Sequence, residues 1–164
     1  MKLVPYTNED STDLLKMMEK HIDFTPEIET PENEIANYDY VHEMCIENQI
    51  GALSYLLKSA DETILGYISA CSREGGQYLM HVRITALFVQ ENDDSVFLAG
   101  IMLERFMRQL CDAKDICVHI NPNVKKAADF WSGSGFIQAP ELSLFINEAN
   151  WHLMAYWKPI FQGC

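Results

Sequence analysis

Helical spacing of apolar side chains marks the first part of the chain. Thr7 to Asp10 supply capping residues before an expected helix. The apolar face of this helix is formed by Leu14, Leu15, Met18 and Ile22. The stretch 26–31 has a proline at each end and breaks the helix, and a second, less regular helix is expected over 32–48.

The same spacing returns twice in the second half. Residues 92–95 cap an expected helix over 96–110, and a last helix is expected over 124–132, ending near Gly133 and Gly135. The apolar face of the first of these is formed by Val96, Ala99, Leu103, Phe106 and Leu110.

Runs rich in β-branched, aromatic and leucine residues alternate with these helices and predict strands. The strands are expected over 2–6, 52–58, 63–71, 78–89, 116–120, 142–146 and 151–157. The resulting order is β-α-α-β-β-β-α-β-α-β-β, and no linker or repeat divides it. A single domain over 1–164 is therefore expected.

Length and composition fit one globular domain. The chain has 164 residues, a mass of 18.8 kDa and 48% hydrophobic residues, which is enough for a full core. No run approaches the roughly eighteen apolar residues of a membrane helix, and the first residues lack the layout of a signal peptide, so a cytoplasmic protein is expected. The five cysteines form no C-x-x-C pair and are expected to be reduced and mostly buried.

The acidic excess is concentrated near one end of the chain. The net charge is −12, and residues 9–47 hold twelve acids against two lysines, a balance of −10. The remaining residues hold twelve acids against ten bases, a balance of −2. Phosphate binding needs clustered lysine and arginine, so nucleic acid is not expected as a partner. A cationic small molecule or a basic protein is favoured.

Three segments in a fixed order carry a resemblance to a known family. A strand ending in Ala86-Leu87-Phe88-Val89 leads through a short loop into an amphipathic helix. The strand 116–120 (ICVHI) is followed by an asparagine and then by 127–136 (AADFWSGSGF), and 151–158 (WHLMAYWK) comes last. This arrangement resembles the Gcn5-related N-acetyltransferase (GNAT) family. The resemblance implies an α+β fold whose mixed, mostly antiparallel central sheet has helices on both faces and splays between the strands ending at Val89 and 120.

Acetyl-CoA is the cofactor that the resemblance implies. In the family the pantetheine arm lies in the splay against the strand backbone, and the following loop and helix start bind the pyrophosphate through free N–H groups. The usual loop pattern, (Gln/Arg)-x-x-Gly-x-(Gly/Ala), counted from Val89, places Asp94, Phe97 and Ala99 at its three defined positions, and only Ala99 fits. The cofactor-binding residues carried over are Leu87, Phe88, Val89, Ser95, Phe97, Leu98, Ala99, Gly100, Asn123 and Trp131.

The positions implied for proton transfer hold unusual residues. Members of the family often use a carboxylate on the central strand as base and a tyrosine in the last helix as acid. Here these positions hold Arg83, which stays protonated, and Trp131, whose indole N–H is not a useful acid. His81, on the same strand face as Arg83, and His119 are the candidate catalytic replacements. For His81 the competing interpretation, and the more common case, is a half-exposed strand residue without a catalytic role; His119 can face either side of the sheet, and Cys117 is expected to be a buried thiol.

The leading interpretation is an N-acetyltransferase that moves an acetyl group from acetyl-CoA to a primary amine of a cationic small molecule or basic peptide. The alternative is a catalytically degenerate protein of the same fold that binds a basic protein through its acidic N-terminal helices. An acyl carrier protein as donor ranks last, because the acidic surface would repel it. No metal site is indicated, and the oligomeric state, a homodimer included, is left open.

Overall fold

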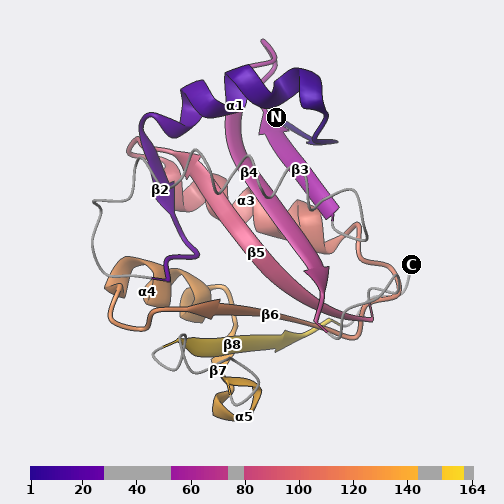
Figure 1. The fold of residues 1–164 in the computed structure, drawn as a ribbon, viewed down its shortest axis with the longest axis vertical. Helices are drawn as coiled ribbons and strands as arrows, with labels where there is room; N and C mark the ends of the chain where they lie inside the picture. The colour runs from indigo at the N-terminus through magenta and orange to yellow at the C-terminus, as the bar shows by residue number, and fades with distance from the viewer. Residues whose placement is uncertain (28–52, 74–79, 144–152, 161–164) are drawn as a thin grey trace.

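The computed structural model describes residues 1–27, 53–73, 80–143 and 153–160 (Figure 1). The strands are β1 (Lys2–Pro5), β2 (His21–Asp23), β3 (Leu53–Lys58), β4 (Ile64–Ser72), β5 (His81–Gln90), β6 (Asp115–Ile120), β7 (Ile137–Gln138) and β8 (Met154–Pro159). The helices are a 3₁₀ turn, η1 (Asn8–Asp10), and α1 (Ser11–Met18), α3 (Ser95–Met107), α4 (Lys125–Gly133) and α5 (Pro140–Ser143).

The strands form one eight-stranded sheet in the order β1-β3-β4-β5-β6-β8-β7, with β2 paired to β5 off this path. The pair β5·β6 is parallel, and the other recorded strand pairs are antiparallel. This confirms the expected mixed, mostly antiparallel sheet, in which β3, β4 and β5 are successive antiparallel neighbours.

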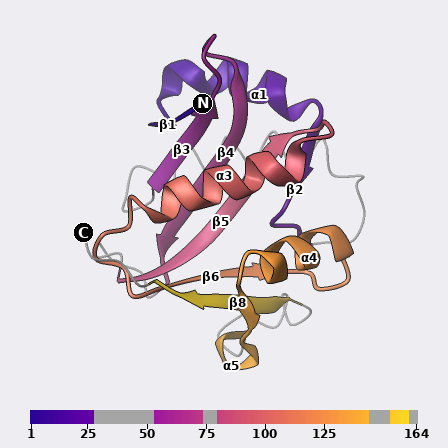
Figure 2. The same ribbon diagram turned by 180° about the vertical axis from the view of Figure 1, so that it is seen from behind.

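Helices cover both faces of the sheet, as the two opposite views show (Figures 1 and 2). On one face α1 buries Leu14 and Met18 against Tyr67 and Phe88. On the other face α3 contributes to a larger cluster that also receives residues of α4, among them Phe130. The apolar repeats of the sequence thus correspond to two separate layers of core.

Two glycines have geometric reasons to be glycine. A Cβ atom on Gly66 of β4 would lie 3.0 Å from both Met102 Sδ and Phe88 O, so α3 approaches β4 closely at this point. Gly135 follows α4 with φ of +88°, in the left-handed region that glycine tolerates best. Its N–H donates to Ser132 O, which completes the expected end of the helix.

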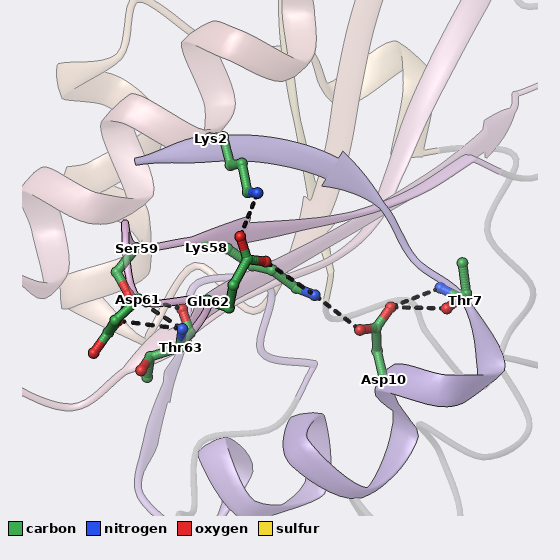
Figure 3. Close-up of polar contacts among 8 residues, drawn as sticks. All are labelled: Lys2, Thr7, Asp10, Lys58, Ser59, Asp61, Glu62 and Thr63. Atoms are coloured by element: carbon green, nitrogen blue, oxygen red, sulfur yellow. Dashed lines mark hydrogen bonds and ion pairs between the residues drawn. The ribbon is translucent and has the colours of Figure 1, made fainter.

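A polar network joins the start of the first helix to the β3–β4 hairpin (Figure 3). Asp10 accepts hydrogen bonds from the backbone and side chain of Thr7, a capping box, and Lys58 Nζ lies 2.9 Å from Asp10 Oδ1. Burial opposes ionisation of Asp10, but the bonds from Lys58 and Thr7 keep the pKa of its carboxyl below the usual value. Lys58 also approaches Glu62, which pairs with Lys2.

Several sequence expectations need correction. The first helix ends at Met18, and Ile22 belongs to β2, because this part of the chain pairs with β5 instead. Val96 is 53% exposed, because the buried face of α3 follows Leu98, Ala99, Met102, Leu103 and Phe106. Leu142 lies in α5 rather than in a strand, because α5 begins at Pro140, which suits a first helical turn.

The remaining differences concern segments and cysteines. The expected helix over 32–48 and the rest of the strand expected over 142–146 lie outside the described residues. The short strands β2 and β7 were not expected. Cys71, half-buried, and Cys117, buried, are free thiols, whereas Cys111 is exposed and disulfide-bonded. This corrects the expectation of five reduced and mostly buried cysteines, because only one of the three described ones is buried.

Candidate active-site groove

Strand β5 contains a β-bulge in the middle of its pairing with β4. Ser69 pairs with Ala86 and the next residue of β4, Ala70, pairs with Ile84, so Thr85 is an extra residue in β5. The extra residue reverses the alternation of side chains. Residues 82, 84, 87 and 89 therefore all face the larger core, whereas residues 86 and 88 face the cluster under α1.

The two parallel strands separate at this bulge. β6 is registered with β5 only from His81, opposite Asp115, to Ile84, opposite Val118. Beyond Ile84, β5 continues to Gln90 without β6 beside it. The resemblance implies this V-shaped opening, and the edge of β5 inside it is where a pantetheine arm would form hydrogen bonds.

In this structure the opening is occupied by residues 20–26 of the same chain, here called the 20–26 segment. Its strand β2 runs antiparallel to β5, with His21 opposite Gln90 and Asp23 opposite Phe88. Figure 1 shows β2 beside β5, on the way from α1 toward α4. At its two ends, Lys20 O accepts from Glu91 N (2.9 Å) and Pro26 O accepts from Asn121 N, beyond β6 (2.8 Å).

The backbone of Leu87 is fully engaged by this segment. Its carbonyl accepts from Phe24 N at 3.0 Å, and its N–H donates to Thr25 Oγ1 at 3.2 Å. Val89 lies opposite Ile22 in the register. The backbone groups of Leu87 and Val89, two of the three strand residues expected to hold the cofactor, therefore face the chain's own segment, whereas those of Phe88 face β4.

Helix α4 holds the segment from the other side of the opening. Trp131 is completely buried, and its Nε1–H donates to Phe24 O at 2.6 Å. The ring of Phe24, also fully buried, lies 4.6 Å from the ring of Phe130 between centroids. Trp131, expected at the cofactor, thus has a defined hydrogen-bonding role within the chain.

Asp23 is a functional candidate that sequence reasoning missed. Its Oδ1 accepts from Thr25 N at 2.7 Å and from Thr25 Oγ1 at 2.9 Å, so the hydroxyl links Leu87 N–H to the carboxylate. Burial raises the pKa of Asp23 to about 6, against the opposing effect of the two bonds from Thr25. The only sequence signal was the short polar-apolar alternation His21-Ile22-Asp23-Phe24.

The loop before α3 is closed by its own hydrogen bonds. Asn92 N donates to Ser95 Oγ, Asp94 N to Asn92 Oδ1 and Ser95 N to Asn92 O, at 2.9, 2.8 and 3.2 Å. Leu98 N bonds Asp94 O at 2.8 Å, so by Leu98 the N–H groups have entered the helical ladder, with Ala99 and Gly100 beyond it. Few N–H groups are left for a phosphate.

The surroundings of this loop also disfavour an anion. Glu91, Asp93 and Asp94 are exposed around it, and Phe97 projects into solvent with 63% exposure. Ser95, Leu98 and Ala99 are buried. Asn123, expected near the cofactor, donates its N–H to Asn121 Oδ1. In this conformation the residues carried over for acetyl-CoA do not fit it, because the N–H groups of Leu87, Ser95 and Asn123 are bound within the chain and carboxylates surround the loop.

The opposite face of the sheet carries a row of polar residues along the paired part of β5 and β6, from His81 and Asp115 at its start to His119, which follows the last pair. His81 Nδ1 lies 3.0 Å from Asp115 Oδ2, and Arg73 Nη1 lies 3.2 Å from Asp115 Oδ1. Arg83 is registered between Cys71 and Cys117 and is exposed. In β6, Asp115, Cys117 and His119 alternate with residues of the larger core, so they share this polar face.

The two candidate histidines differ in their partners. The Asp115 carboxylate fixes the ring of His81 and leaves the role of proton acceptor to Nε2. Neither ring nitrogen of His119 has a hydrogen-bond partner of regular geometry in the described part of the chain. Burial, together with the charges of Arg83 and Arg73, lowers the pKa of His119. Burial raises the pKa of Cys117, which fits a buried thiol.

Comparison with solved structures identifies the fold. No protein-family model matches the chain, and no curated protein is similar to it in sequence. An aminoglycoside 6′-acetyltransferase type Ii is similar over 100% of both chains, with 14% identity and a TM-score of 0.68. An acetyltransferase from Thermus thermophilus is similar over 97% of this chain and 96% of its own, with 18% identity and a TM-score of 0.65.

A third similar structure was solved with ligands. It is a spermidine N-acetyltransferase from Vibrio cholerae in complex with CoA and spermine, with 13% identity, a TM-score of 0.60 and coverage of 96% of this chain and 94% of its own. The chain therefore has the fold of the Gcn5-related N-acetyltransferases, as the sequence resemblance implied. Within the described residues, no helix is long and apolar enough to cross a membrane.

Proposed function

We propose that the chain, as one domain over 1–164, is an N-acetyltransferase that transfers an acetyl group from acetyl-CoA to a primary amine. The observation that supports this most is the separation of β5 and β6 at the Thr85 bulge. Beyond Ile84 this edge of β5 is not paired with β6, and an extended ligand can reach it once the 20–26 segment has left; the sheet is shared with acetyltransferases over nearly the whole chain. A strand edge of this kind offers a row of backbone hydrogen-bonding groups to an extended ligand.

His81 is the residue proposed to accept the proton of the acceptor amine. Asp115 orients its ring, and Arg73 in turn bonds the other oxygen of Asp115. Arg83 is not a base, but a fixed cation near an amine disfavours the ammonium form and so favours the reactive free amine. His119 is the second candidate on the same face.

A cationic acceptor, a small molecule or a basic peptide, is proposed from the charge distribution. Residues 9–47 carry a balance of −10, and α1 with its flanks contributes Glu9, Asp10, Asp13 and Glu19 to it. Similar structures include enzymes named for aminoglycosides and for spermidine, which are polycations. Such attraction strengthens capture and weakens with salt.

A second candidate function is favoured by a specific observation. The closed loop before α3 and the occupied edge of Leu87 fit a catalytically degenerate protein that binds a basic protein partner through its acidic N-terminal region. Such a protein would have no use for acetyl-CoA.

Calorimetry with acetyl-CoA separates the two functions. Binding is expected for the acetyltransferase, followed by thiol release with polycationic amines in preference to neutral amino acids. His81→Asn is expected to lower kcat by about 10²–10⁴-fold with the affinity for acetyl-CoA unchanged, and His119→Asn shows whether the other histidine is the base instead. If neither the wild type nor Thr25→Val, which weakens the hold of the 20–26 segment on β5, gives heat at millimolar acetyl-CoA, the proposed function is contradicted. The catalytically degenerate protein is then the function that remains.

A further inference from the structure

The 20–26 segment takes the hydrogen bonds that an extended ligand would take from the edge of β5. A ligand lying along the same edge needs the Leu87 N–H and carbonyl, which bond Thr25 Oγ1 and Phe24 N. Two extended chains cannot pair with one strand edge at the same place. Occupation by the segment and occupation by a ligand are therefore mutually exclusive.

We propose that the 20–26 segment is a built-in competitor of acetyl-CoA, a strap that closes the groove in the free protein and must leave before the cofactor enters. The inference rests on the proposed function, because it assumes that acetyl-CoA binds in this groove. It predicts that the measured affinity for acetyl-CoA equals the intrinsic affinity reduced by the fraction of molecules in which the strap is open.

The identity of residue 131 supports this role. The resemblance places a tyrosine at this position in many members of the family, as an acid. Trp131 instead donates its indole N–H to Phe24 O, within the strap. Trp131, which stands where the family often has a catalytic tyrosine, thus binds the segment that occupies the edge of β5. The two departures from the family pattern, the tryptophan and the occupied edge, are joined by one hydrogen bond.

The strap is anchored at one end and less covered at the other. Phe24, Thr25 and Pro26 are buried, whereas His21, Ile22 and Asp23 are half-buried and Lys20 is exposed. β2 has only three residues and pairs only with β5 among the described strands. These features fit a segment that separates from β5 first at β2 and then withdraws Phe24 from the core.

A reversible cross-link tests the strap directly. His21 and Gln90 are register partners in the antiparallel pair β2·β5, and partners of this kind have Cα atoms about 4.5–5.5 Å apart, within the range of a disulfide. The double variant His21→Cys with Gln90→Cys is expected to lose acetyl-CoA binding by at least about tenfold when oxidised and to regain it on reduction. The wild type, oxidised and reduced in parallel, controls for the native disulfide at Cys111.

A release variant tests the strap in the opposite direction. Thr25→Val keeps the shape of the side chain and removes the hydroxyl that bonds Leu87 N–H and Asp23. It is expected to bind acetyl-CoA about fivefold more tightly, because the loss of a hydrogen bond raises the open fraction by that order. Thr25→Ser should restore the wild-type affinity. Ser54→Ala is the control: it removes a hydroxyl on β3, two strands away from β5, that bonds Tyr67, and it should leave the affinity for acetyl-CoA unchanged.

The outcomes distinguish the strap from the proposed function. Loss on oxidation together with tighter binding by Thr25→Val supports the strap. If the oxidised and reduced forms of the double variant bind acetyl-CoA with equal affinity, the strap is overturned. The proposed acetyltransferase function is kept in that case, because both forms bind the cofactor. Absence of acetyl-CoA binding in the wild type, the reduced double variant and Thr25→Val overturns the proposed function, and the strap loses its competitor role with it.

Discussion

The backbone groups along the two edges of β5 are paired in different ways. Toward β4 the strand is paired from Val82 to Val89, with one bulge. Toward β6 it is paired for four residues, and the rest of that edge is covered by the 20–26 segment. The first edge is held by a regular ladder and close packing. The second depends on a few bonds between residues distant in sequence: Leu87 N–H donates to Thr25 Oγ1, and Trp131 Nε1–H donates to Phe24 O.

This difference indicates where the molecule can change shape. A ladder with many equivalent hydrogen bonds opens only with the sheet, whereas a short strand held by a few individual contacts can open locally. If a strand edge has to be covered in the free protein and open when a ligand binds, a short strand held by a few individual contacts suits it better than a continuous ladder. Substitutions at the two edges of β5 should therefore differ in their effects.

The largest effect is expected for Phe24→Ala. Phe24 is fully buried between β5 and α4, so its loss should cost about 3–5 kcal/mol of unfolding free energy. Phe97→Ala is the matched control, because Phe97 is 63% exposed and should change stability by no more than about 0.5 kcal/mol. Chemical denaturation measures both. Similar losses in the two variants would mean that Phe24 is not part of the core.

Gly66→Ala tests the regular edge. The new Cβ would lie 3.0 Å from Phe88 O, a backbone atom, and should cost about 1–3 kcal/mol through overpacking. Gly100→Ala in α3 meets nothing within 4 Å and should stabilise the protein by up to about 1 kcal/mol. Thermal unfolding of the two variants should therefore shift in opposite directions, and a shift in the same direction would contradict the packing of α3 on β4.

Trp131→Phe should cost about 1–3 kcal/mol, because it leaves the buried carbonyl of Phe24 without its donor. The same variant should bind acetyl-CoA more tightly if the strap is closed by this bond. A destabilised variant with unchanged affinity would confine Trp131 to a structural role. Denaturation and calorimetry on one preparation supply both values.

Asp23 should make the stability depend on pH. Its pKa is raised from 3.8 to about 6, so the folded protein holds a proton more tightly than the unfolded chain does. Its contribution is therefore fully present below about pH 4 and is lost as the pH rises through 6. His21 and Glu27 are the charged neighbours that act on it. Asp23→Asn should remove this decline between pH 4 and 6, and an unchanged decline would assign it to other groups.

The smallest effect is expected at the polar network around Asp10 and Lys58. Lys58→Met removes the ion pair with Asp10 and keeps the aliphatic stem. The two side chains are only 16% and 15% exposed, but Thr7 still bonds the Asp10 carboxylate, so the loss should be about 1 kcal/mol. Asp10→Asn combined with Lys58→Met measures the pair itself in a double-mutant cycle. A loss of unfolding free energy as large as that of Phe24→Ala would contradict the ranking of the buried Phe24 above this ion pair.

The sequence predicted the elements whose apolar residues repeat regularly. α3, α4 and strands β3 to β6 lie close to their expected positions, because burial against one continuous core imposes a period on the sequence. The end of α4 followed from Gly135. The resemblance supplied the fold and the place of the groove, including the separation of β5 from β6.

The occupation of the groove could not be predicted from local patterns. β2 has three residues, and Ile22 also continues the helical repeat of Leu14 and Met18, so the local pattern favoured helix. What decides the structure is pairing with Phe88 to Gln90, more than sixty residues away. The raised pKa of Asp23 and the bond of Trp131 follow from that pairing and have no signal of their own in the sequence.

The exchange rate of the Leu87 amide hydrogen, measured by NMR in the free protein, tests the central claim most directly. Leu87 N–H faces the opening, and among the described residues its recorded acceptor is Thr25 Oγ1. We predict that it exchanges slowly in the wild type and markedly faster in Thr25→Val, while amides of β5 that bond β4 do not change. Rapid exchange at Leu87 in the wild type would show that the 20–26 segment does not close the groove.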